Sequence, residues 1–316
     1  MRIVISEFID DAAAASLAAD FDVRYDPALV ERPAELGIEM TRADALIVRN
    51  RTRVDGVLLA GAPRLKVVGR LGVGLDNIDL DACAARRIEV IPATGVNARS
   101  VAEYVIAAAL LLRRGAYDSS ATVAAGQWPR AALSQGRELA GSTLGIVGFG
   151  SVGRLVAELA HGLSVRVIAC DDAISAESTL WAQQGAVPRA LDKLLAEADI
   201  VSLHVPLTQT THRLIDARRL ALMKRDAVLI NTSRGGIVDE GALAAALRAG
   251  NLAGAALDVF EHEPLPAAST LAGCPAMLLT PHIAGVTRES NARVSAFIAA
   301  EVAAALTRRD DHSVHV

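Results

Sequence analysis

The stretch Leu144-Gly145-Ile146-Val147-Gly148-Phe149-Gly150-Ser151-Val152-Gly153 decides the fold of this 316-residue chain. A short apolar run leads directly into Gly-x-Gly-x-x-Gly, and an acid, Asp171, follows roughly 20 residues later. This order is the fingerprint of a dinucleotide-binding βαβ unit. The spacing predicts that Gly148 allows a tight turn, Gly150 lets the backbone approach a pyrophosphate, and Gly153 lets the next helix pack on the strand.

The residues after the turn support this interpretation. Apolar residues recur at helical spacing from Val152 to Leu163, and residues 165–170 read as a second strand that ends at Asp171. Asp171 is placed to accept hydrogen bonds from ribose hydroxyls, and Asp172 adds a second negative charge that would repel a 2′-phosphate. The pair therefore favours NAD over NADP, and an ordinary strand-end turn is the alternative.

Composition narrows the class of protein. The chain is long enough for two domains, and it is 52% hydrophobic but only 3% aromatic, which suits helices packed on a parallel sheet. A formal net charge of −4 gives no general attraction to nucleic acid or anionic membranes, and no apolar run approaches a membrane span. The start of the chain reads as a strand, not a signal peptide. The three cysteines show no paired or metal-ligand spacing, so we expect no metal and a reducing cytoplasm.

Strands and helices alternate along the whole chain, which predicts an α/β fold. Further strands are expected at residues 3–6, 22–25, 45–48, 66–69, 89–91, 199–203, 227–231, 253–258 and 277–279. A long helix is expected at residues 100–114, where Ser100 and Glu103 form a capping box. Residues 116–140 lack clear periodicity and read as a crossing arm. A final helix is expected at residues 287–306, followed by a frayed end.

Three polar residues follow apolar strands at turn-rich positions and qualify for chemistry: Arg234, Glu263 and His282. Ligands in open α/β sheets bind beyond the carboxyl ends of the strands, where all three are expected. Arg234 is suited to a bidentate grip on a carboxylate. Each also has an ordinary alternative, which is a surface ion pair for Arg234, a solvated loop for Glu263 and a structural role for His282.

At this point the chain resembles the D-isomer-specific 2-hydroxyacid dehydrogenases. Besides the glycine stretch, the motifs that carry the resemblance are residues 70–79, 204–208, 231–236, 257–264 and 280–285. The closest likeness is to the 3-phosphoglycerate dehydrogenase branch in its short form, without a regulatory domain. Bacterial sulfolactate dehydrogenases look similar too, including residues 47–52. The family implies a Rossmann NAD-binding domain at residues 98–286 and a discontinuous, flavodoxin-like substrate domain at residues 1–97 and 287–316.

The resemblance also implies catalytic roles. Arg234 would hold the substrate's carboxylate and carbonyl, and His282 would protonate the carbonyl oxygen or, in reverse, take the hydroxyl proton. Glu263 would orient His282 and stabilise its cationic form. Reduction is then expected to be favoured at lower pH and oxidation at higher pH.

Cofactor and substrate contacts follow from the same resemblance. Contacts with NAD are implied for Gly148, Phe149, Gly150, Ser151, Val152, Gly153, Asp171, His204, Val205, Pro206, Thr208, Thr232, Ser233, Asp258 and Gly285, with Asp258 on the nicotinamide amide. Substrate contacts are expected from Arg49, Asn50, Val73, Gly74, Arg234 and His282. Arg49, Arg51 and Arg70 would add charge for a second substrate anion, phosphate or sulfonate. The alternatives are a plain turn at Val73 and solvated arginines.

The expected function is reversible hydride transfer between NAD(H) and a small 2-hydroxy or 2-oxo acid, most like 3-phosphoglycerate dehydrogenase. Sulfolactate and glyoxylate or hydroxypyruvate dehydrogenases are the alternatives within the family. An NADH-sensing corepressor is the alternative of a different class. Formate dehydrogenase has a glutamine at the matching position, so Glu263 speaks against it.

The expected assembly is a homodimer formed through the NAD-binding domains. The helix at residues 100–114 and the arm around Trp128 would supply the contact. Burial of both within one subunit is the alternative. No nucleic-acid or membrane partner is expected.

Overall fold

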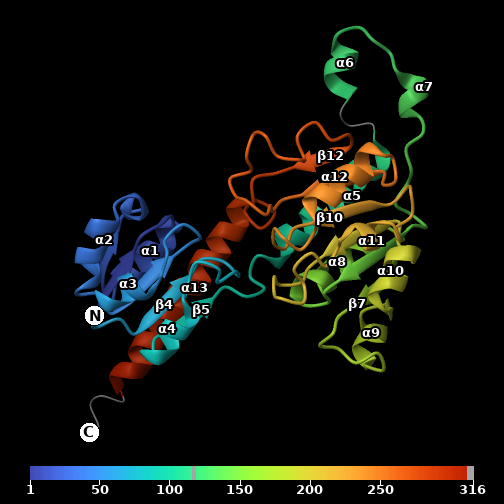
Figure 1. The fold of residues 1–316 in the computed structure, drawn as a ribbon. Coiled ribbons are helices and arrows are strands. Elements are labelled where there is room, and N and C mark those ends of the chain that lie inside the picture. The colour runs from blue at the N-terminus through green and yellow to red at the C-terminus, as the bar shows by residue number, and fades with distance from the viewer. Residues whose placement is uncertain (116–118, 312–316) are drawn as a thin grey trace. The chain divides into compact units, whose positions relative to one another are not determined.

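The computed structural model of the chain describes residues 1–115 and 119–311. It divides into two compact units, Met1–Asn97 with Val286–Val316, and Ala98–Gly285 (Figure 1). Each unit has a sheet of parallel strands with helices on both faces, so the predicted fold class is confirmed. Among the described residues, no helix combines the length and apolar character that a membrane crossing requires.

The first unit contains a five-stranded parallel sheet. Its strands are β1 (Arg2–Ile5), β2 (Asp22–Tyr25), β3 (Ala45–Val48), β4 (Val67–Arg70) and β5 (Glu89–Pro92). Their order across the sheet is β2-β1-β3-β4-β5, which is the flavodoxin-like order. The direction of winding reverses between β1 and β3, so the carboxyl ends of these two strands form the switch point where ligands bind in such sheets.

Helices cover both faces of this sheet because alternate strand residues point to opposite sides. The helices of the unit are η1 (Leu29–Glu31), α1 (Asp11–Ala18), α2 (Pro33–Met40), α3 (Gly56–Ala60), α4 (Leu80–Ala85) and α13 (Arg288–Asp311). Ile3 and Ile5 face the core under α1 and α13, whereas Val4 faces the core under α2, α3 and α4. The C-terminal helix α13 therefore completes a core that the first 97 residues begin.

Close approach of α13 to β4 depends on Gly69. A Cβ at Gly69 would lie 2.7 Å from a methyl group of Val302 and 2.8 Å from one of Ile298. Both of these α13 side chains are fully buried. The missing side chain in β4 thus makes room for the final helix.

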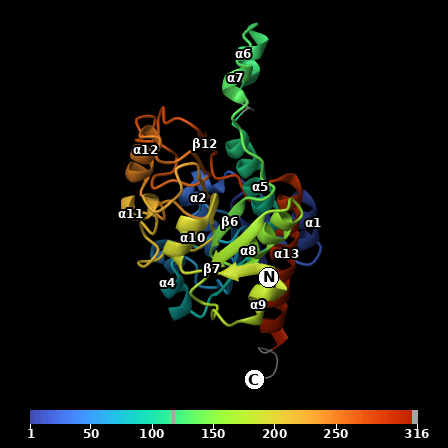
Figure 2. The ribbon, with the colours of Figure 1, turned by 90° about the vertical axis from the view of Figure 1, so that its right-hand side faces the viewer.

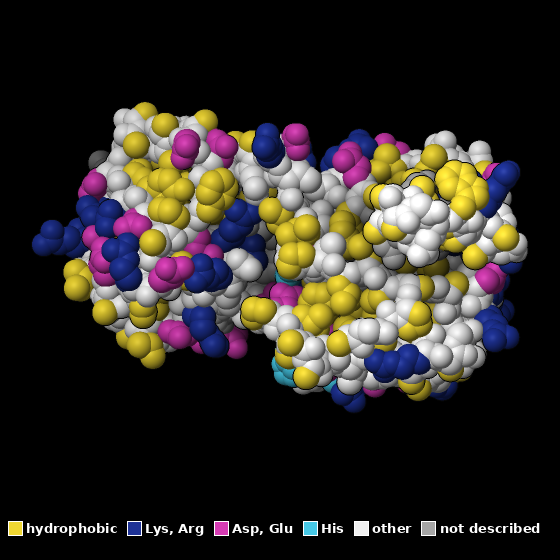
Figure 3. Space-filling view, turned by 90° about the horizontal axis from the view of Figure 1, so that it is seen from above, with side chains coloured by type: hydrophobic (Ala, Val, Ile, Leu, Met, Phe, Trp, Pro, Cys, Tyr) yellow, Lys and Arg dark blue, Asp and Glu magenta, His cyan; other side chains and the backbone are white. Residues whose placement is uncertain are grey.

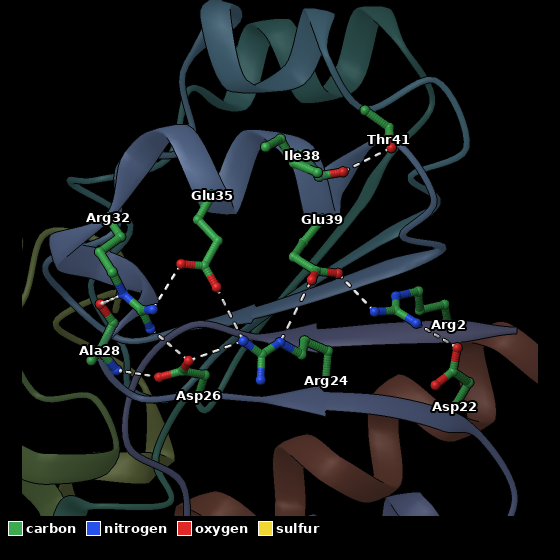
Figure 4. A network of polar contacts seen from close by, with 10 residues as sticks. All are labelled: Arg2, Asp22, Arg24, Asp26, Ala28, Arg32, Glu35, Ile38, Glu39 and Thr41. Atoms are coloured by element: carbon green, nitrogen blue, oxygen red, sulfur yellow. Dashed lines mark hydrogen bonds and ion pairs between the residues drawn. The ribbon is translucent and has the colours of Figure 1, made fainter.

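A network of ion pairs covers one edge of the first unit, where β1, β2 and α2 meet (Figure 4). Its charged members are Arg2, Asp22, Arg24, Asp26, Arg32, Glu35 and Glu39. Arg2 pairs with Asp22 and Glu39 at 2.7 Å each, and hydrogen bonding to these carboxylates raises the pKa of Arg2. These side chains are exposed or half-buried, so we expect salt to screen the network.

The second unit contains a seven-stranded parallel sheet. Its strands are β6 (Thr143–Val147), β7 (Arg166–Cys170), β8 (Ala186–Pro188), β9 (Ile200–Leu203), β10 (Val228–Asn231), β11 (Gly254–Leu257) and β12 (Met277–Leu279). The order is β12-β11-β10-β9-β6-β7-β8, so the winding reverses between β6 and β9. This is the Rossmann arrangement with one further strand, β12, at the edge.

Two apolar cores lie on the two faces of this sheet. One packs against α5 (Ala98–Arg114), α8 (Ser151–His161) and α9 (Thr179–Gln183). The other packs against α10 (Leu191–Glu197), α11 (Ala217–Leu220) and α12 (Glu240–Arg248). The carboxyl ends of β6 and β9, which form the switch point, are therefore supported by packed helices on both faces of the sheet.

An arm projects from the second unit between α5 and β6. It carries two short helices, α6 (Ser120–Ala124) and α7 (Arg130–Leu133), which lie apart from the rest of their unit (Figure 2). No residue in the range 119–138 is buried, and the side chain of Trp128 is 76% exposed. The predicted arm is thus partly helical, although residues 116–118 lie outside the described part.

Several predicted boundaries were wrong. The helix expected at residue 100 begins at Ala98, so Ser100 lies inside α5 and is not its N-cap, because Ala98 and Arg99 are themselves good helix formers. The final helix continues to Asp311 through residues expected to be frayed. The short strand β8 was not predicted. Residues 312–316 lie outside the described range.

Candidate active site

The turn after β6 and the first turn of α8 hold the three glycines of the fingerprint. Gly148 has a φ of +92°, and a Cβ there would lie 2.6 Å from the carbonyl oxygen of His204. A Cβ on Gly153 would lie 2.3 Å from the carbonyl oxygen of Gly148. Around Gly150, by contrast, the same position has no described atom within 4 Å, and α8 begins there without a side-chain cap. This turn therefore fits a pyrophosphate, since backbone can approach it and the first N–H groups of a helix follow.

Asp171 follows β7 beside this turn. Its Oδ2 accepts the N–H of Phe149 at 2.7 Å, and its Oδ1 accepts the N–H of Ala173 at 2.9 Å. These bonds fix the carboxylate at the edge of the sheet, where it is partly exposed. Each carboxylate oxygen has further acceptor capacity, which suits the two hydroxyls of a ribose.

Three of the residues expected to contact the cofactor have side chains that point into the protein. Phe149 is 1% exposed and packs against Trp181, with ring centroids 5.0 Å apart. Val205 packs against the core under α10, α11 and α12. The hydroxyl of Ser233 donates to the carbonyl oxygen of Leu203 at 2.5 Å. These side chains shape the edge of the sheet, and any ligand contact there involves mainly their backbone.

Three further residues expected at the cofactor, His204, Thr208 and Thr232, differ in their surroundings. His204 lies 2.9 Å from the hydroxyl of Ser202 through Nε2, and burial lowers the pKa of its imidazole to about 4, so it is neutral near pH 7. The exposed Thr208 is bonded within its own turn to Thr211. The Thr232 hydroxyl is buried and has no hydrogen-bond partner among the described residues. A ligand group could supply that missing partner.

Glu263 and His282 form a direct pair. His282 Nδ1 lies 2.8 Å from Glu263 Oε2, and Glu263 Oε1 accepts the N–H of Phe260 at 3.1 Å. Because a carboxylate only accepts, Nδ1 carries the proton of this bond, which leaves Nε2 to exchange a proton with a ligand. The His282 side chain is 43% exposed, so that nitrogen is within reach of solvent or substrate.

Asp258 fixes the loop that carries His282. This aspartate is 1% exposed, and its oxygens accept the N–H groups of Ile283 at 2.8 Å and Ala284 at 2.7 Å. Its backbone oxygen also accepts the N–H of His282 at 2.9 Å. His282 has a φ of +57°, a conformation that a non-glycine residue keeps only when its surroundings impose it. Asp258 supplies that constraint, while its contact with a nicotinamide stays a prediction.

A chain of hydroxyls continues from Asp258. Thr280 Oγ1 donates to Asp258 Oδ1 at 2.6 Å, and the Tyr104 hydroxyl lies 2.6 Å from the same threonine oxygen. Since the threonine proton goes to the carboxylate, Tyr104 is the donor of the second bond. Burial raises the pKa of Tyr104, so it keeps that proton. Helix α5 is thereby tied to the His282 loop.

Arg234 follows β10 in a loop that Asn231 organises. The Asn231 amide donates to the carbonyl oxygen of Arg234 at 2.9 Å and accepts the N–H of Ser233 at 3.0 Å. The strands β10, β11 and β12 are parallel neighbours. Arg234, Glu263 and His282 each follow one of these strands, so the structure brings all three to one edge of the second sheet.

The expected substrate residues of the first unit follow two neighbouring strands of its sheet, and only the first pair lies at the switch point between β1 and β3. Arg49 and Asn50 follow β3, and Val73 and Gly74 follow β4. The guanidinium of Arg49 donates to Asn291 Oδ1 at 2.5 Å and lies 5.6 Å from the ring centre of Phe8. Partial burial lowers the pKa of Arg49, since desolvation disfavours its charge. An anion next to this cation would be stabilised.

Sequence reasoning missed Glu7, which holds the Arg49 loop. This buried carboxylate accepts the N–H groups of Arg49 at 2.8 Å, Thr52 at 2.9 Å and Arg51 at 3.1 Å. The side-chain amide of Asn77 donates to the carbonyl oxygens of Arg49 and Thr52 and so fixes the same loop from its other side. The signal available in the sequence was a carboxylate directly after an apolar strand, but its partners lie more than 40 residues away.

Comparison with known proteins decides the family. Residues 106–284 match the family model for the D-isomer specific 2-hydroxyacid dehydrogenase, NAD binding domain. The chain belongs to this family. It is therefore an NAD-dependent oxidoreductase that acts on the CH–OH group of 2-hydroxy acids. The predictions of an enzyme and of NAD as cofactor are confirmed, which argues against the corepressor alternative.

Individual dehydrogenases of the family differ in their similarity to this one. The (S)-sulfolactate dehydrogenase of Chromohalobacter salexigens is 55% identical over 293 residues, 93% of this chain and 94% of that protein. The D-3-phosphoglycerate dehydrogenase of Mycobacterium leprae is 39% identical over 306 residues, 96% of this chain but only 56% of that protein. The crystal structure of D-lactate dehydrogenase from Aquifex aeolicus, complexed with NAD and lactic acid, has 30% identity and a TM-score of 0.81, covering 99% of this chain and 97% of that one.

Proposed function

We propose that this dehydrogenase interconverts 3-sulfolactate and 3-sulfopyruvate with NAD(H). The observation that carries the proposal is the 55% identity to a sulfolactate dehydrogenase over nearly the full length of both chains. The branch expected first from the motifs, 3-phosphoglycerate dehydrogenase, has the lower identity of 39% and a much longer chain. Similarity thus favours the sulfolactate alternative over the main expectation.

The stereochemical label of this substrate agrees with a D-specific family. In sulfolactate the sulfur-bearing carbon outranks the carboxyl carbon in the naming rules, whereas in lactate the carboxyl carbon outranks the methyl group. The (S) label of sulfolactate therefore describes the same spatial arrangement as that of a D-2-hydroxy acid. The hydride therefore reaches the same face of the carbonyl carbon in 3-sulfopyruvate as in the 2-oxo acid of a D-2-hydroxy acid.

Arg234, His282 and Glu263 are the proposed catalytic residues. When bound, NAD would accept the hydride that leaves C2 of the hydroxy acid, and NADH would return it to C2 of the oxo acid. Arg234 holds the carboxylate and the C2 oxygen, which aligns the substrate. His282 takes the C2 hydroxyl proton at Nε2 during oxidation and returns a proton to the carbonyl oxygen during reduction. Glu263 holds Nδ1 at 2.8 Å and stabilises the imidazolium while it carries that proton.

The cofactor is proposed to bind at the switch point of the second sheet. The open space at Gly150 and the uncapped start of α8 support a pyrophosphate site, and the carboxylate of Asp171, which backbone N–H groups hold beside this turn, supports a ribose site. The unpartnered hydroxyl of Thr232 supports a further contact with the dinucleotide. On this proposal Ala98–Gly285 is the NAD-binding domain, and the unit formed by Met1–Asn97 and Val286–Val316 is the substrate domain.

A sulfonate is proposed to bind at Arg49. Its guanidinium is partly buried, and the loop that carries it is fixed by Glu7 and Asn77. A fixed, partly desolvated guanidinium stabilises a compact anion, because little reorganisation is needed on binding. Asn50, Val73 and Gly74 are proposed as further contacts of the same substrate.

A panel of 2-oxo acids tests the substrate. NADH oxidation is measured with 3-sulfopyruvate, 3-phosphohydroxypyruvate, glyoxylate and pyruvate. We expect kcat/KM for 3-sulfopyruvate to exceed the other values by about tenfold or more, and Arg49→Met to remove most of that preference while pyruvate reduction changes little. A higher kcat/KM for 3-phosphohydroxypyruvate would contradict the proposal.

A further inference from the structure

Glu240 makes a contact that no catalytic assignment explains. It is the first residue of α12 and is half-buried. Its Oε1 accepts the backbone N–H of Glu261 at 2.7 Å. Glu261 is two residues before Glu263, so this carboxylate reaches the loop that carries the partner of His282. The bond joins residues 21 apart in the chain.

The same loop is held at a second point by Gly235. A Cβ at Gly235 would lie 1.8 Å from the carbonyl oxygen of Phe260 and 2.6 Å from the N–H nitrogen of Glu261. The backbone after β10 and the backbone after β11 are therefore in direct contact. Gly235 and Glu240 belong to the segment that begins at Arg234, so one continuous stretch both carries Arg234 and supports the Glu263 loop.

The side chain of Glu263 completes this arrangement. Its Oε1 accepts the N–H of Phe260 at 3.1 Å, while its Oε2 pairs with His282 at 2.8 Å. That N–H belongs to the Val259–Phe260 peptide, which is joined through the Cα atom of Phe260 to the Phe260–Glu261 peptide, so the orientation of the Glu263 carboxylate depends on where these two consecutive peptides lie. The second of them, Phe260–Glu261, is located by Gly235 on one side and by Glu240 on the other.

Open space borders the loop near Glu240. A cavity of about 360 Å³ is lined by Glu240 and Glu261 together with Arg213, His262, Leu265 and Ser269, among others. Where a loop borders a cavity, few apolar contacts resist its displacement. The charge-assisted hydrogen bond that Glu240 accepts from Glu261 restrains the loop on that side.

We propose that Glu240 is a positioning residue for the reaction. Its carboxylate fixes the Phe260–Glu261 peptide and with it the adjoining Phe260 N–H, which orients Glu263 and through it the imidazole of His282. The inference rests on the proposed roles of Glu263 and His282. It adds that the segment from Arg234 to Glu240 keeps the carboxylate-binding arginine and the proton-transfer pair in a fixed relation within the second unit. The ordinary alternative is that Glu240 only stabilises the start of α12.

Three variants test the proposal. Glu240→Ala removes the acceptor, whereas Glu240→Gln keeps an amide oxygen at the Oε1 position and is expected to retain the bond to Glu261. Arg248→Ala is the matched control, because Arg248 on the same helix donates to the carbonyl oxygens of Thr270 and Ala272 and holds a neighbouring loop. All three are assayed as full chains with the 2-oxo acid that the unmodified enzyme reduces fastest.

The first readout is independent of catalysis. Amide hydrogen exchange of the peptide spanning residues 258–264 is measured without substrate or cofactor. We expect Glu240→Ala to raise exchange at Phe260 and Glu261, and we expect Glu240→Gln and Arg248→Ala to leave it near the unmodified rate.

The second readout is kinetic. We expect Glu240→Ala to lower kcat for reduction by about tenfold, with the KM for NADH changed less than about twofold, because positioning rather than cofactor binding is lost. Reduction in this variant should also fall off at a lower pH, since a displaced Glu263 stabilises the imidazolium less. Glu240→Gln should restore most of kcat and the original pH profile, and Arg248→Ala should match the unmodified enzyme in both.

The possible outcomes separate the two proposals. Unchanged kcat in Glu240→Ala would overturn the positioning role, whether or not exchange rises. Equal losses in Glu240→Ala and Glu240→Gln, or an equal loss in Arg248→Ala, would also overturn it in favour of a structural role. Full activity of His282→Ala would instead contradict the proposed function itself.

Discussion

At the scale of single residues, the two nitrogens of His282 have different surroundings. Nδ1 faces Glu263, and Nε2 is left for a ligand. Three consecutive N–H groups, from His282 to Ala284, are held by Asp258, which keeps His282 in a left-handed conformation. The proposed proton-transfer group is thus oriented both through its ring and through its backbone. Such double constraint is what a preorganised site requires.

Cysteine chemistry gives a prediction at the same scale. Burial raises the pKa of the Cys170 thiol to about 12, and the neighbouring charges of Asp172 and Asp171 act in the same direction. The thiolate is the reactive form, so the folded protein should be inert at this position near pH 8. We expect iodoacetamide at pH 8 to leave Cys170 unmodified in the native protein and to modify it in urea.

Mass spectrometry of tryptic peptides measures both samples of this labelling experiment. The urea sample is the control for reagent access and for detection of the peptide. Rapid native alkylation of Cys170 would show that the end of β7 is not packed as described.

At the scale of elements, the packing of α13 on β4 makes a second prediction. Gly69→Ala places a methyl group within 2.7–2.8 Å of Val302 and Ile298. Overpacking of this kind typically costs about 1–3 kcal/mol. We expect a lower free energy of unfolding by urea, with the loss confined to the first unit.

Gly37→Ala is a suitable comparison for Gly69→Ala, since no atom of the described residues outside the neighbouring backbone of α2 lies within 4 Å of a Cβ there. In helix α2 that substitution is expected to be neutral or stabilising. Equal stability of the two variants would mean that α13 does not pack closely on β4.

Most elements could be predicted from the sequence because their signals are local. The strands β2, β3 and β12 have the predicted bounds, and the strands around the glycine turn are shifted by no more than about one residue. The start of α5 was wrong because a capping signal is weaker than the helix propensity of Ala98 and Arg99. The strand β8 has only three residues, which is too few for a pattern.

In the candidate site, the three residues that follow strands could be predicted, but the residues that support them could not. Arg234, Glu263 and His282 follow strands, and the order of parallel strands brings such residues to one edge. The supporting residues Glu7, Asp258 and Glu240 act through contacts between distant segments, which a single sequence does not reveal. The inward side chains of Phe149 and Ser233 were also missed, because position in a motif does not fix direction.

At the scale of the whole molecule, each unit contains its own reversal of strand order. The first unit places a partly desolvated arginine at that point, and the second places a glycine turn there. This arrangement is expected if the first unit binds the substrate anion and the second unit binds the dinucleotide. The proposed function uses both switch points.

The exposed arm leads to a prediction about assembly. None of residues 119–138 is buried, and Trp128 is 76% and Val123 40% exposed. Hydrophobic side chains also lie on the surface of the second unit in the view of Figure 3. We propose that a second copy of the chain covers the arm. The unmodified protein should sediment as a dimer, and Val123→Asp with Trp128→Asp should shift it to a monomer.

Ile38→Asp in the first unit is the control for this experiment, because Ile38 is 71% exposed but lies on α2 and not on the arm. It should leave the sedimentation coefficient unchanged. A monomeric unmodified protein would contradict the proposed assembly.

The pH dependence of kcat in both directions is the sharpest test of proton transfer by His282. Proton donation by His282 requires the imidazolium for reduction and the neutral ring for oxidation. With 3-sulfopyruvate and NADH, kcat should therefore decrease as pH rises, and with sulfolactate and NAD it should increase over the same interval. His282→Asn should abolish both slopes together with most of the activity. Parallel pH profiles in the two directions would show that His282 is not the proton-transfer group.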